Sequence, residues 1–129
     1  MPLDISVKET RQEAYLVTLN GSLDSVTFDK FEKEVFLFVG QAKALVLDLT
    51  NLNYISSMGL RSLSRLRIAM SEKGGAVYLV NPQHYIQQVL ETVRVLSDDF
   101  LSTLEEADEL LDAFLSKMQK GEIKPRKPL

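Results

Sequence analysis

The spacing of hydrophobic residues predicts two strands at the start of the chain. Tyr15, Val17 and Leu19 recur at every second position, as in a strand that buries one face. A similar short segment lies at 4–9, and the polar stretch TRQE separates the two. We therefore expect an antiparallel pair of strands at 4–9 and 14–20, with Gly21 at the end of the second.

The next segment, 25–40, predicts a helix. Its apolar residues recur at intervals of three and four, which places them on one face of a helix. Ser25 or Thr27 is placed to cap the start of this helix, and Gly40 to end it. The expected buried face consists of Phe28, Phe31, Val35 and Phe38.

Two nearly continuous apolar runs, at 42–50 and 76–80, predict strands that are covered on both faces. A polar loop is expected after the first run, and Asn81-Pro82 ends the second. Helical spacing predicts a second helix between the runs, ending at Gly74-Gly75, and a third helix after them. The expected buried faces consist of Leu60, Leu63, Leu66 or Arg67, and Met70 in the second helix, and Ile86, Val89, Leu90 and Val93 in the third.

The last part of the chain predicts a turn with at most a brief strand over 95–104, and then a final helix over 105–120. The alternation of strands and helices favours an α/β fold with a mixed, mostly parallel sheet of 4–5 strands and about four helices. We expect a single domain over residues 1–116. Residues 117–129 contain two prolines and no apolar periodicity, which predicts a basic, disordered tail.

The composition narrows the class of protein. With 45% hydrophobic and 26% charged residues, and no run of eighteen apolar residues, the chain is typical of a soluble globular protein without a membrane span. The start MPLDISVKE lacks the basic and apolar regions of a secretory signal, so we expect a cytoplasmic protein. The absence of cysteine excludes disulfides, a thiol nucleophile and cysteine-based zinc sites.

The charge is unevenly distributed along the chain. Residues 117–129 contain five of the fifteen basic residues and one acidic residue, and so carry +4. Since the whole chain carries −3, the other 116 residues carry −7. Nucleic-acid binding needs a clustered basic face, so this acidic body argues against direct binding of nucleic acid.

Two adjacent serines, Ser56 and Ser57, stand where the second predicted helix begins. A serine at such a place can cap the helix, attack a substrate, bind a phosphate or receive one. A hydrolase is disfavoured, because the chain has a single histidine, His84, and SSMG differs from the G-x-S-x-G elbow. A phosphate-binding loop usually supplies several glycines and a lysine, and here only Gly59 is present.

Metal binding is disfavoured as well. The acids at 98–99 are adjacent, and those at 105–109 have the spacing of a solvated helix without histidine partners. We therefore expect surface charge, with no metal and no other cofactor. From the residues alone, the simplest role for one of the two serines is a helix cap.

Three longer motifs resemble a known family. They are GSLD after the second strand, ALVLDLTNLNYISSMGLRSLSRLRIAMSEKGGAVYLVNP, and VLETVRVLSDDF. Together they resemble the STAS domain, and in particular the stand-alone anti-sigma factor antagonists of bacteria. The resemblance covers roughly residues 3–115 and is best over Leu45–Pro82, where strand, loop, Ser-x-Gly-Leu, helix, Gly-Gly and strand follow in the family's order.

The resemblance implies a partner switch that regulates transcription. In this family the unphosphorylated form binds an ATP-dependent serine kinase that is also the anti-sigma factor, which frees the sigma factor. Phosphorylation of one serine breaks the complex, and a serine phosphatase restores it. The family's stretch is Asp-Ser-Ser/Thr-Gly-Leu with the first serine as acceptor, so the resemblance implies Ser57 as the acceptor and Ser56 as the alternative.

The chain departs from this pattern at two positions. Ser56 replaces the family's acid and Met58 its second hydroxyl, which changes the charge and polarity that a kinase would meet. The resemblance also implies a partner-binding surface around the acceptor. Its expected members are Leu23, Asp24, Ser56, Met58, Gly59, Leu60 and Arg61.

Other interpretations remain for these residues. Leu23 and Asp24 can belong to a structural turn, in which Gly21 gives the bend and Asp24 or Ser25 caps the first helix. Arg61 can be a solvated helix residue or can pair with a phosphate one turn away. If Ser57 accepts no phosphate, the chain is a constitutive STAS scaffold or a transport-accessory subunit, and a nucleotide-binding module is a third possibility. We expect a kinase substrate rather than an enzyme, and a monomer or weak dimer.

Overall fold

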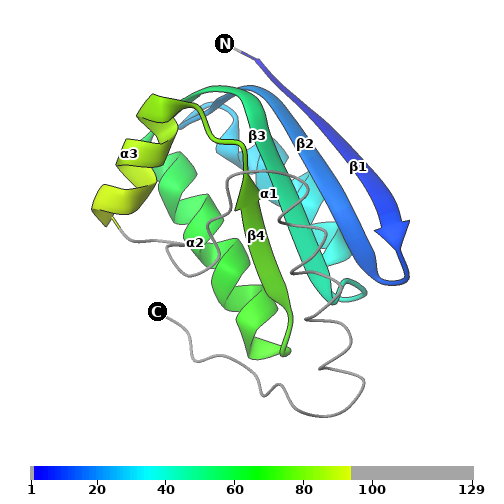
Figure 1. Cartoon of the computed structure of the whole chain (residues 1–129). Coiled ribbons are helices and arrows are strands. Elements are labelled where there is room, and N and C mark those ends of the chain that lie inside the picture. Colours follow the sequence, from blue (N-terminus) through cyan, green and yellow to red (C-terminus); the bar gives the residue numbers. More distant parts are fainter. Residues whose placement is uncertain (1, 94–129) are drawn as a thin grey trace.

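The computed structural model describes residues 2–93, which form one sheet and three α-helices (Figure 1). The predicted strand within 95–104, the final helix and the basic tail lie outside the described residues. The elements follow in the order β1 (Leu3–Arg11), β2 (Ala14–Leu23), α1 (Phe28–Val35), the 3-10 helix η1 (Phe36–Phe38), β3 (Ala44–Ile55), α2 (Ser57–Glu72), β4 (Ala76–Val80) and α3 (His84–Val93).

The four strands lie in the order β1-β2-β3-β4. β1 pairs antiparallel with β2, whereas β2, β3 and β4 run parallel to one another. The predicted mixed, mostly parallel sheet with an antiparallel pair at its start is thus confirmed. Gly21 is required here, because its φ is 121° and a Cβ would lie 2.0 Å from the carbonyl oxygen of Pro2.

β3 is longer than the sequence predicted. The expected polar loop over 51–55 is the second half of this strand, and it pairs with β2 up to Ile55. β4 ends opposite Asp48. Beyond this residue, the side of β3 that faces away from β2 has no strand partner among the described residues. Instead, the side-chain amide of Gln83 donates to the carbonyl oxygen of Thr50 at 3.1 Å and covers part of that edge.

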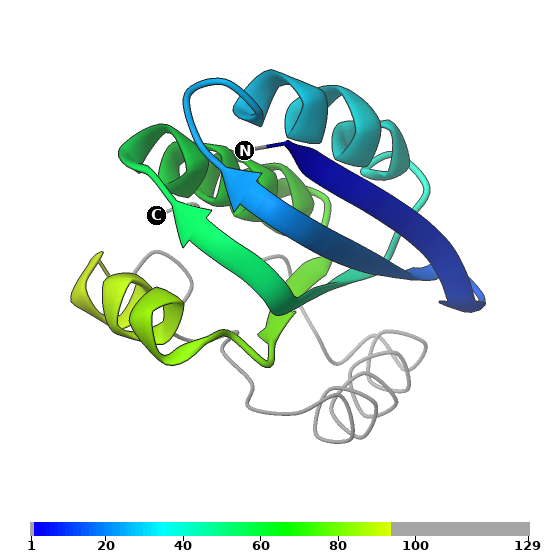
Figure 2. The same cartoon turned by 90° about the horizontal axis from the view of Figure 1, so that it is seen from above.

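The main hydrophobic core lies between the sheet and the helices. Figure 2 shows α1 and α2 side by side on one face of the sheet. Each helix contributes buried side chains to this core, as the predicted periodicity requires, and β1, β2, β3 and β4 supply the facing ones. The helical residues in it are Phe31 and Val35 from α1, Leu63, Leu66 and Met70 from α2, and Ile86 and Leu90 from α3.

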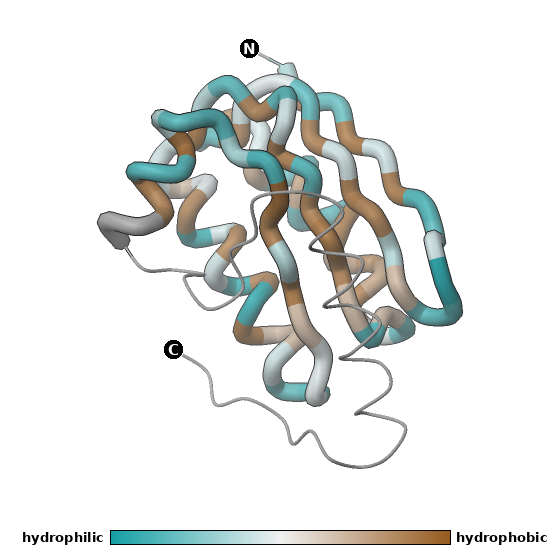
Figure 3. Tube along the Cα trace, in the orientation of Figure 1, coloured by the Kyte–Doolittle hydropathy of each residue, from teal (hydrophilic) through white to brown (hydrophobic). Residues whose placement is uncertain are grey.

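A second, smaller apolar cluster occupies the opposite face of the sheet. Its described members all come from β2, β3 and β4. In Figure 3 hydrophobic positions follow these strands, whereas the hairpin between β1 and β2 is hydrophilic. The sheet is therefore apolar on both faces along its inner strands, as the continuous apolar runs predicted.

The first helix differs from the prediction at both ends. α1 begins at Phe28 after Thr27, but neither Thr27 nor Ser25 provides the side-chain cap that we expected. The regular helix ends at Val35, and the 3-10 helix η1 continues the helical path, so that Gly40 lies two residues beyond it. A Cβ at Gly40 would meet nothing within 4 Å, so glycine is not required for this ending.

Polar contacts connect α2 and the residue after it with α1 and with the loop that follows η1. The Glu32 carboxylate accepts from the buried Ser62 hydroxyl at 2.5 Å and forms an ion pair with Arg65. Partial burial raises the pKa of Glu32, but these two partners outweigh it and hold the pKa below its ordinary value. Beyond the end of α2, the Lys73 ammonium donates to the carbonyl oxygens of Val39 and Ala42, and burial lowers the pKa of Lys73.

Candidate functional site

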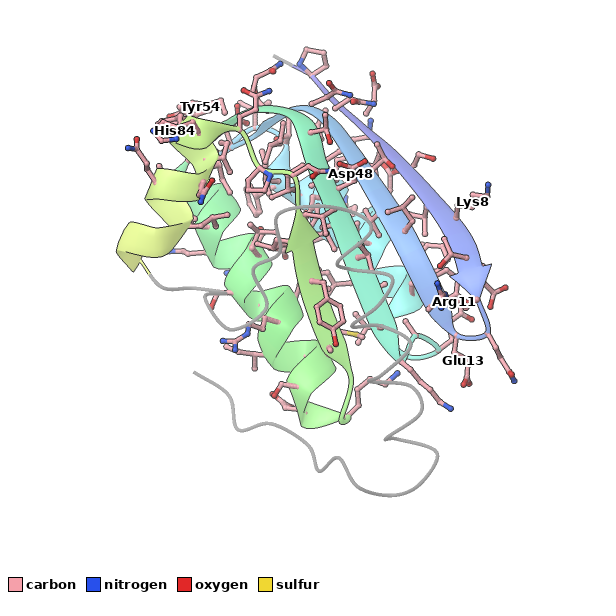
Figure 4. All side chains as sticks on the ribbon, viewed as in Figure 1. Lys8, Arg11, Glu13, Asp48, Tyr54 and His84 are labelled. Atoms are coloured by element: carbon pink, nitrogen blue, oxygen red, sulfur yellow. The ribbon has the colours of Figure 1, made fainter. Side chains whose placement is uncertain are left out.

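The candidate site lies at the edge of the sheet where the parallel strands end. β3 leads directly into α2, and β4 leads through a short turn into α3, so both helices begin at this edge (Figure 1). Tyr54 and His84 lie there, whereas Arg11 and Glu13 lie at the opposite edge (Figure 4). In open α/β sheets this edge is where functional residues usually gather.

Ser56 is the cap of α2. Its backbone is extended, with φ −99° and ψ 176°, and its Oγ accepts a hydrogen bond from the backbone N–H of Gly59 at 3.3 Å. Its carbonyl oxygen accepts from the N–H of Leu60 at 2.9 Å, which is the first hydrogen bond of the helix. Ser56 is thus the serine that caps the helix, which is the simplest role predicted for one of the two serines.

Ser57 differs from Ser56 in its surroundings. It is the first residue of α2 and is exposed. Within residues 2–93 its hydroxyl makes no hydrogen bond, so it belongs to no capping network. An exposed hydroxyl at the amino end of a helix is accessible to another protein, and the helix dipole favours negative charge at this position.

The loop after β2 is fixed against the start of α2. The backbone N–H of Ser56 donates to the carbonyl oxygen of Leu23 at 3.0 Å. At Gly59, an added Cβ would lie 2.3 Å from the same oxygen and 2.9 Å from Cγ1 of Ile55. Leu23 and Gly59 are both buried, so they hold the two segments together and offer no side chain to a partner.

Asp24 organises the turn that leads into α1. Its Oδ1 accepts from the backbone N–H groups of Val26 and Thr27 at 2.9 and 3.0 Å. The Thr27 hydroxyl donates to the carbonyl oxygen of Ser22 at 2.6 Å, so it faces inward. Burial raises the pKa of Asp24, but the hydrogen bonds from Val26 and Thr27 outweigh it and hold this pKa below its usual value.

The exposed part of the site is formed by four predicted residues together with Ser57. Asp24, Met58 and Leu60 are half-buried, and Arg61 is exposed on the second turn of α2. The predicted residues therefore fall into two groups. Ser56, Leu23 and Gly59 build the junction of the two segments, whereas Ser57, Met58, Arg61 and part of Asp24 and Leu60 face outward.

A sequence profile of the STAS domain matches residues 6–107. The chain belongs to the STAS domain family. This confirms the family predicted from the sequence motifs. No curated protein sequence gives a significant match to the chain.

Solved structures share the fold of this STAS domain. SpoIIAA, an anti-sigma factor antagonist, matches in its unphosphorylated form with a TM-score of 0.76 and 15% identity, over 85% of this chain and 97% of that chain. Its phosphorylated form from Bacillus gives a TM-score of 0.70 and 16% identity, over 84% and 99%. A putative anti-sigma factor antagonist from Thermotoga maritima gives 0.75 and 22%, over 81% and 92%.

A transporter contains the same fold as one part of a longer chain. The murine Slc26a9 anion transporter matches this STAS domain with a TM-score of 0.70 and 17% identity, over 81% of this chain but only 18% of the transporter. At these identities the structural matches show the fold alone. The antagonists and this chain are similar in extent, whereas the transporter is several times longer.

Two exposed features of this STAS domain were missed by the sequence analysis. Val26 is 83% exposed in the loop that adjoins α2, and Tyr54 stacks on Tyr85 with ring centroids 6.5 Å apart. These tyrosines are 47% and 48% exposed. Val26 could have been noticed as an apolar residue outside the helical spacing of 28–38, whereas the contact between Tyr54 and Tyr85 depends on the fold.

The described residues give no indication of a metal centre or a membrane span. No group of three or more metal-ligating side chains occurs within residues 2–93. In the same part of the chain, no helix combines the length and the apolar character needed to cross a membrane. The acids at 98–99 and 105–109, which we interpreted as surface charge, lie outside the described residues.

Proposed function

We propose that this STAS domain is a phosphorylation-controlled protein-interaction switch of the anti-sigma factor antagonist type. In its unphosphorylated form it binds an ATP-dependent serine kinase that also serves as anti-sigma factor in the cytoplasm, and phosphorylation of Ser57 releases it. A serine phosphatase restores the binding form. The chain acts as the substrate of these enzymes.

The observation that carries this proposal is the division of roles between the two serines. The Ser56 hydroxyl is engaged with Gly59 in the cap of α2, whereas the Ser57 hydroxyl is exposed and makes no hydrogen bond within residues 2–93. A kinase must place the acceptor oxygen in its own active site, so an engaged, half-buried hydroxyl is a poor acceptor. The exposed Ser57 meets this requirement without any change in the fold.

The position of Ser57 also explains how a phosphate would be tolerated by the domain itself. A phosphoryl group adds about −1.5 to −2 charge at neutral pH. At the first residue of α2 it would lie against free backbone N–H groups and the positive end of the helix dipole. Phosphorylation is therefore expected to leave the fold intact.

The same charge would weaken a complex in which this surface is covered. The neighbouring Met58 is half-buried, and the loop that follows Leu23 contains the exposed Val26; both are apolar groups that a partner can bury. A phosphate placed among them must lose water without gaining a matching charge. A loss of about 2.7 kcal/mol already weakens binding a hundredfold.

A constitutive STAS scaffold or transport-accessory subunit is the alternative function. The departures from the family pattern at Ser56 and Met58 support it, and so does the likeness to the transporter's domain. In that case the surface around Ser57 would bind its partner regardless of phosphate. The two functions predict opposite results for the modification of Ser57.

Intact-mass analysis with site mapping of the protein purified from its native host tests the proposal. We expect one added phosphate that maps to Ser57 and is lost in Ser57→Ala. It should persist in Ser56→Ala and in Ser25→Ala, the matched control for an exposed serine on the adjoining loop. Absence of phosphate across growth and stress conditions, and with candidate kinases and ATP, would contradict the switch and favour the scaffold.

A further inference from the structure

The face of the sheet that points away from α1 and α2 carries a compact apolar patch. The register aligns one alanine from each of β2, β3 and β4 in a first row, and larger side chains from the same strands in a second. Val80 extends the patch along β4. The patch consists of Ala14, Ala44 and Ala76 in the first row, Leu16, Val46 and Tyr78 in the second, and Val80.

This outer patch is buried although no described helix contributes to it. The relative exposures of Val46, Ala76 and Tyr78 are only 5, 6 and 8%, and both Ala44 and Val80 are at 0%. The apolar side chains of α1, α2 and α3 belong to the other core instead. Something beyond residues 2–93 must therefore cover the outer patch.

The size of the outer patch fits a single helix. Three strands about 4.8 Å apart span a width of about 10 Å, which is also the diameter of one α-helix with its side chains. Polar residues limit the patch on two sides. β1 presents the exposed Asp4, Ser6 and Lys8, and the next row toward the strand ends contains Thr18 and Asp48.

The chain after Val93 contains one segment that matches this requirement. Between 104 and 118, five apolar residues recur at intervals of three, four, three and four, which gives a helix one apolar stripe that Leu110 and Leu115 widen. The ten residues 94–103 can span about 33 Å when extended, enough to pass from α3 around the β4 edge. The stripe consists of Leu104, Ala107, Leu111, Phe114 and Met118.

We propose that residues 104–118 form an amphipathic helix that docks on the outer patch. The patch lies at the starts of β2, β3 and β4, whereas Ser57 follows the end of β3, so the docked segment leaves the acceptor surface open. The proposal is therefore independent of whether Ser57 is phosphorylated. A second copy of the chain on the same patch is the competing occupant that the experiment must separate.

Thiol labelling of the full-length protein tests this docking, because the chain contains no cysteine of its own. A single Val46→Cys places a thiol in the outer patch, and Lys8→Cys provides an exposed reference on β1. A thiol reacts with Ellman's reagent only when solvent reaches it. We expect Val46→Cys to react at least about a hundredfold more slowly than Lys8→Cys, because access requires local opening.

Combined variants identify what protects the thiol. Leu111→Asp on the apolar stripe should speed the labelling of Val46→Cys at least about tenfold by favouring local opening. The matched control, Ser116→Asp on the polar side of the same segment, should leave it unchanged. A thiol in the other core, Val17→Cys, should stay protected in both backgrounds, which shows that the sheet remains folded.

Two results would overturn the proposal. Equal protection of Val46→Cys in the Leu111→Asp and Ser116→Asp backgrounds would show that residues 104–118 do not cover the patch. Protection that disappears on dilution, together with a disulfide-linked dimer of Val46→Cys, would show that a second copy covers it. Loss of protection at Val17→Cys together with Val46→Cys would mean unfolding, and the milder Leu111→Ser then replaces Leu111→Asp.

Discussion

The starts of α1 and α2 adjoin each other and use similar residues, but they differ in what they leave exposed. At α1 the side chains of Asp24 and Thr27 are both engaged within the turn. At α2 the cap needs only Ser56, and the next residue, Ser57, has an exposed hydroxyl that makes no hydrogen bond within residues 2–93. Of two adjacent serines, one therefore stabilises the start of the helix, whereas the other has a side chain that is exposed to solvent.

The largest effect is expected at the point where the two starts touch. Glycine to alanine in a helix ordinarily stabilises by up to about 1 kcal/mol. Gly59→Ala should instead destabilise by about 3 kcal/mol, because the new Cβ would meet the backbone oxygen of Leu23 at 2.3 Å. Urea unfolding measures the change in the free energy of unfolding. Gly40→Ala is the control, since its Cβ meets nothing, and equal effects at both positions would refute this account.

The next largest effect should come from the start of α1. Asp24→Ala removes the acceptor for two backbone N–H groups and should destabilise by about 1 to 2 kcal/mol. Ser25→Ala, at an exposed position in the same loop, should change the stability by less than about 0.5 kcal/mol. Thermal unfolding followed by circular dichroism would compare the two variants with the parent chain.

Asp24 should also affect how stability varies with pH. Its pKa is lower in the folded state, so its contribution is present above the unfolded value of about 3.9 and is lost as the pH falls through the folded value. Asp24→Asn should therefore flatten the loss of stability below about pH 4. A parallel pH dependence in parent and variant would show that the carboxylate charge is not what Val26 and Thr27 bind.

A smaller loss is expected at the cap of α2. Ser56→Ala should destabilise by about 1 kcal/mol, since the N–H of Gly59 loses its acceptor. Ser56→Asp should retain most of the stability, because aspartate caps helices about as well as serine. Chemical denaturation of the three proteins gives these differences, and an effect of Ser56→Asp as large as that of Ser56→Ala would argue against a capping role.

The smallest effect should be found at Ser57. Ser57→Ala should lie within about 0.5 kcal/mol of the parent chain, because its hydroxyl makes no hydrogen bond within residues 2–93. Ser57→Asp should stabilise by about 0.3 to 1 kcal/mol and Ser57→Lys should destabilise, since the helix dipole favours negative charge there. The difference between the two charged variants should shrink in 1 M salt. Melting curves at low and high salt would test this order.

Sequence patterns predicted most of the described fold because its helices and its first two strands follow regular periods. They failed in the second half of β3. There the pairing with β2 shifts twice, and at each shift β3 contains one residue more than the facing stretch of β2. Leu49, Leu52 and Ile55 consequently reach the core at intervals of three, which hides the two-residue period of a strand. The exposed residues between them looked like a loop.

The candidate site was only partly predictable for a related reason. Motif resemblance pointed to two segments that the fold brings together, but it could not separate residues that hold the segments together from those that face solvent. Leu23 and Gly59 belong to the first group because a carbonyl oxygen passes close to a helix there, and such an approach depends on the tertiary structure. The stacking of Tyr54 on Tyr85 joins two elements 31 positions apart and has no local signal.

The polar contacts between α1 and α2 have a consequence for how far a signal can travel. Polar contacts hold α2 at three levels. Its cap, Ser56, donates to Leu23 at the end of β2, its middle binds Glu32 of α1 through Ser62 and Arg65, and Lys73, just after it, donates to Val39 and Ala42 beyond η1. Contacts at three levels along α2 oppose sliding or rotation of this helix past its neighbours. A modification at Ser57 would then act without moving the helices. Only a protein that directly contacts this surface would respond to it.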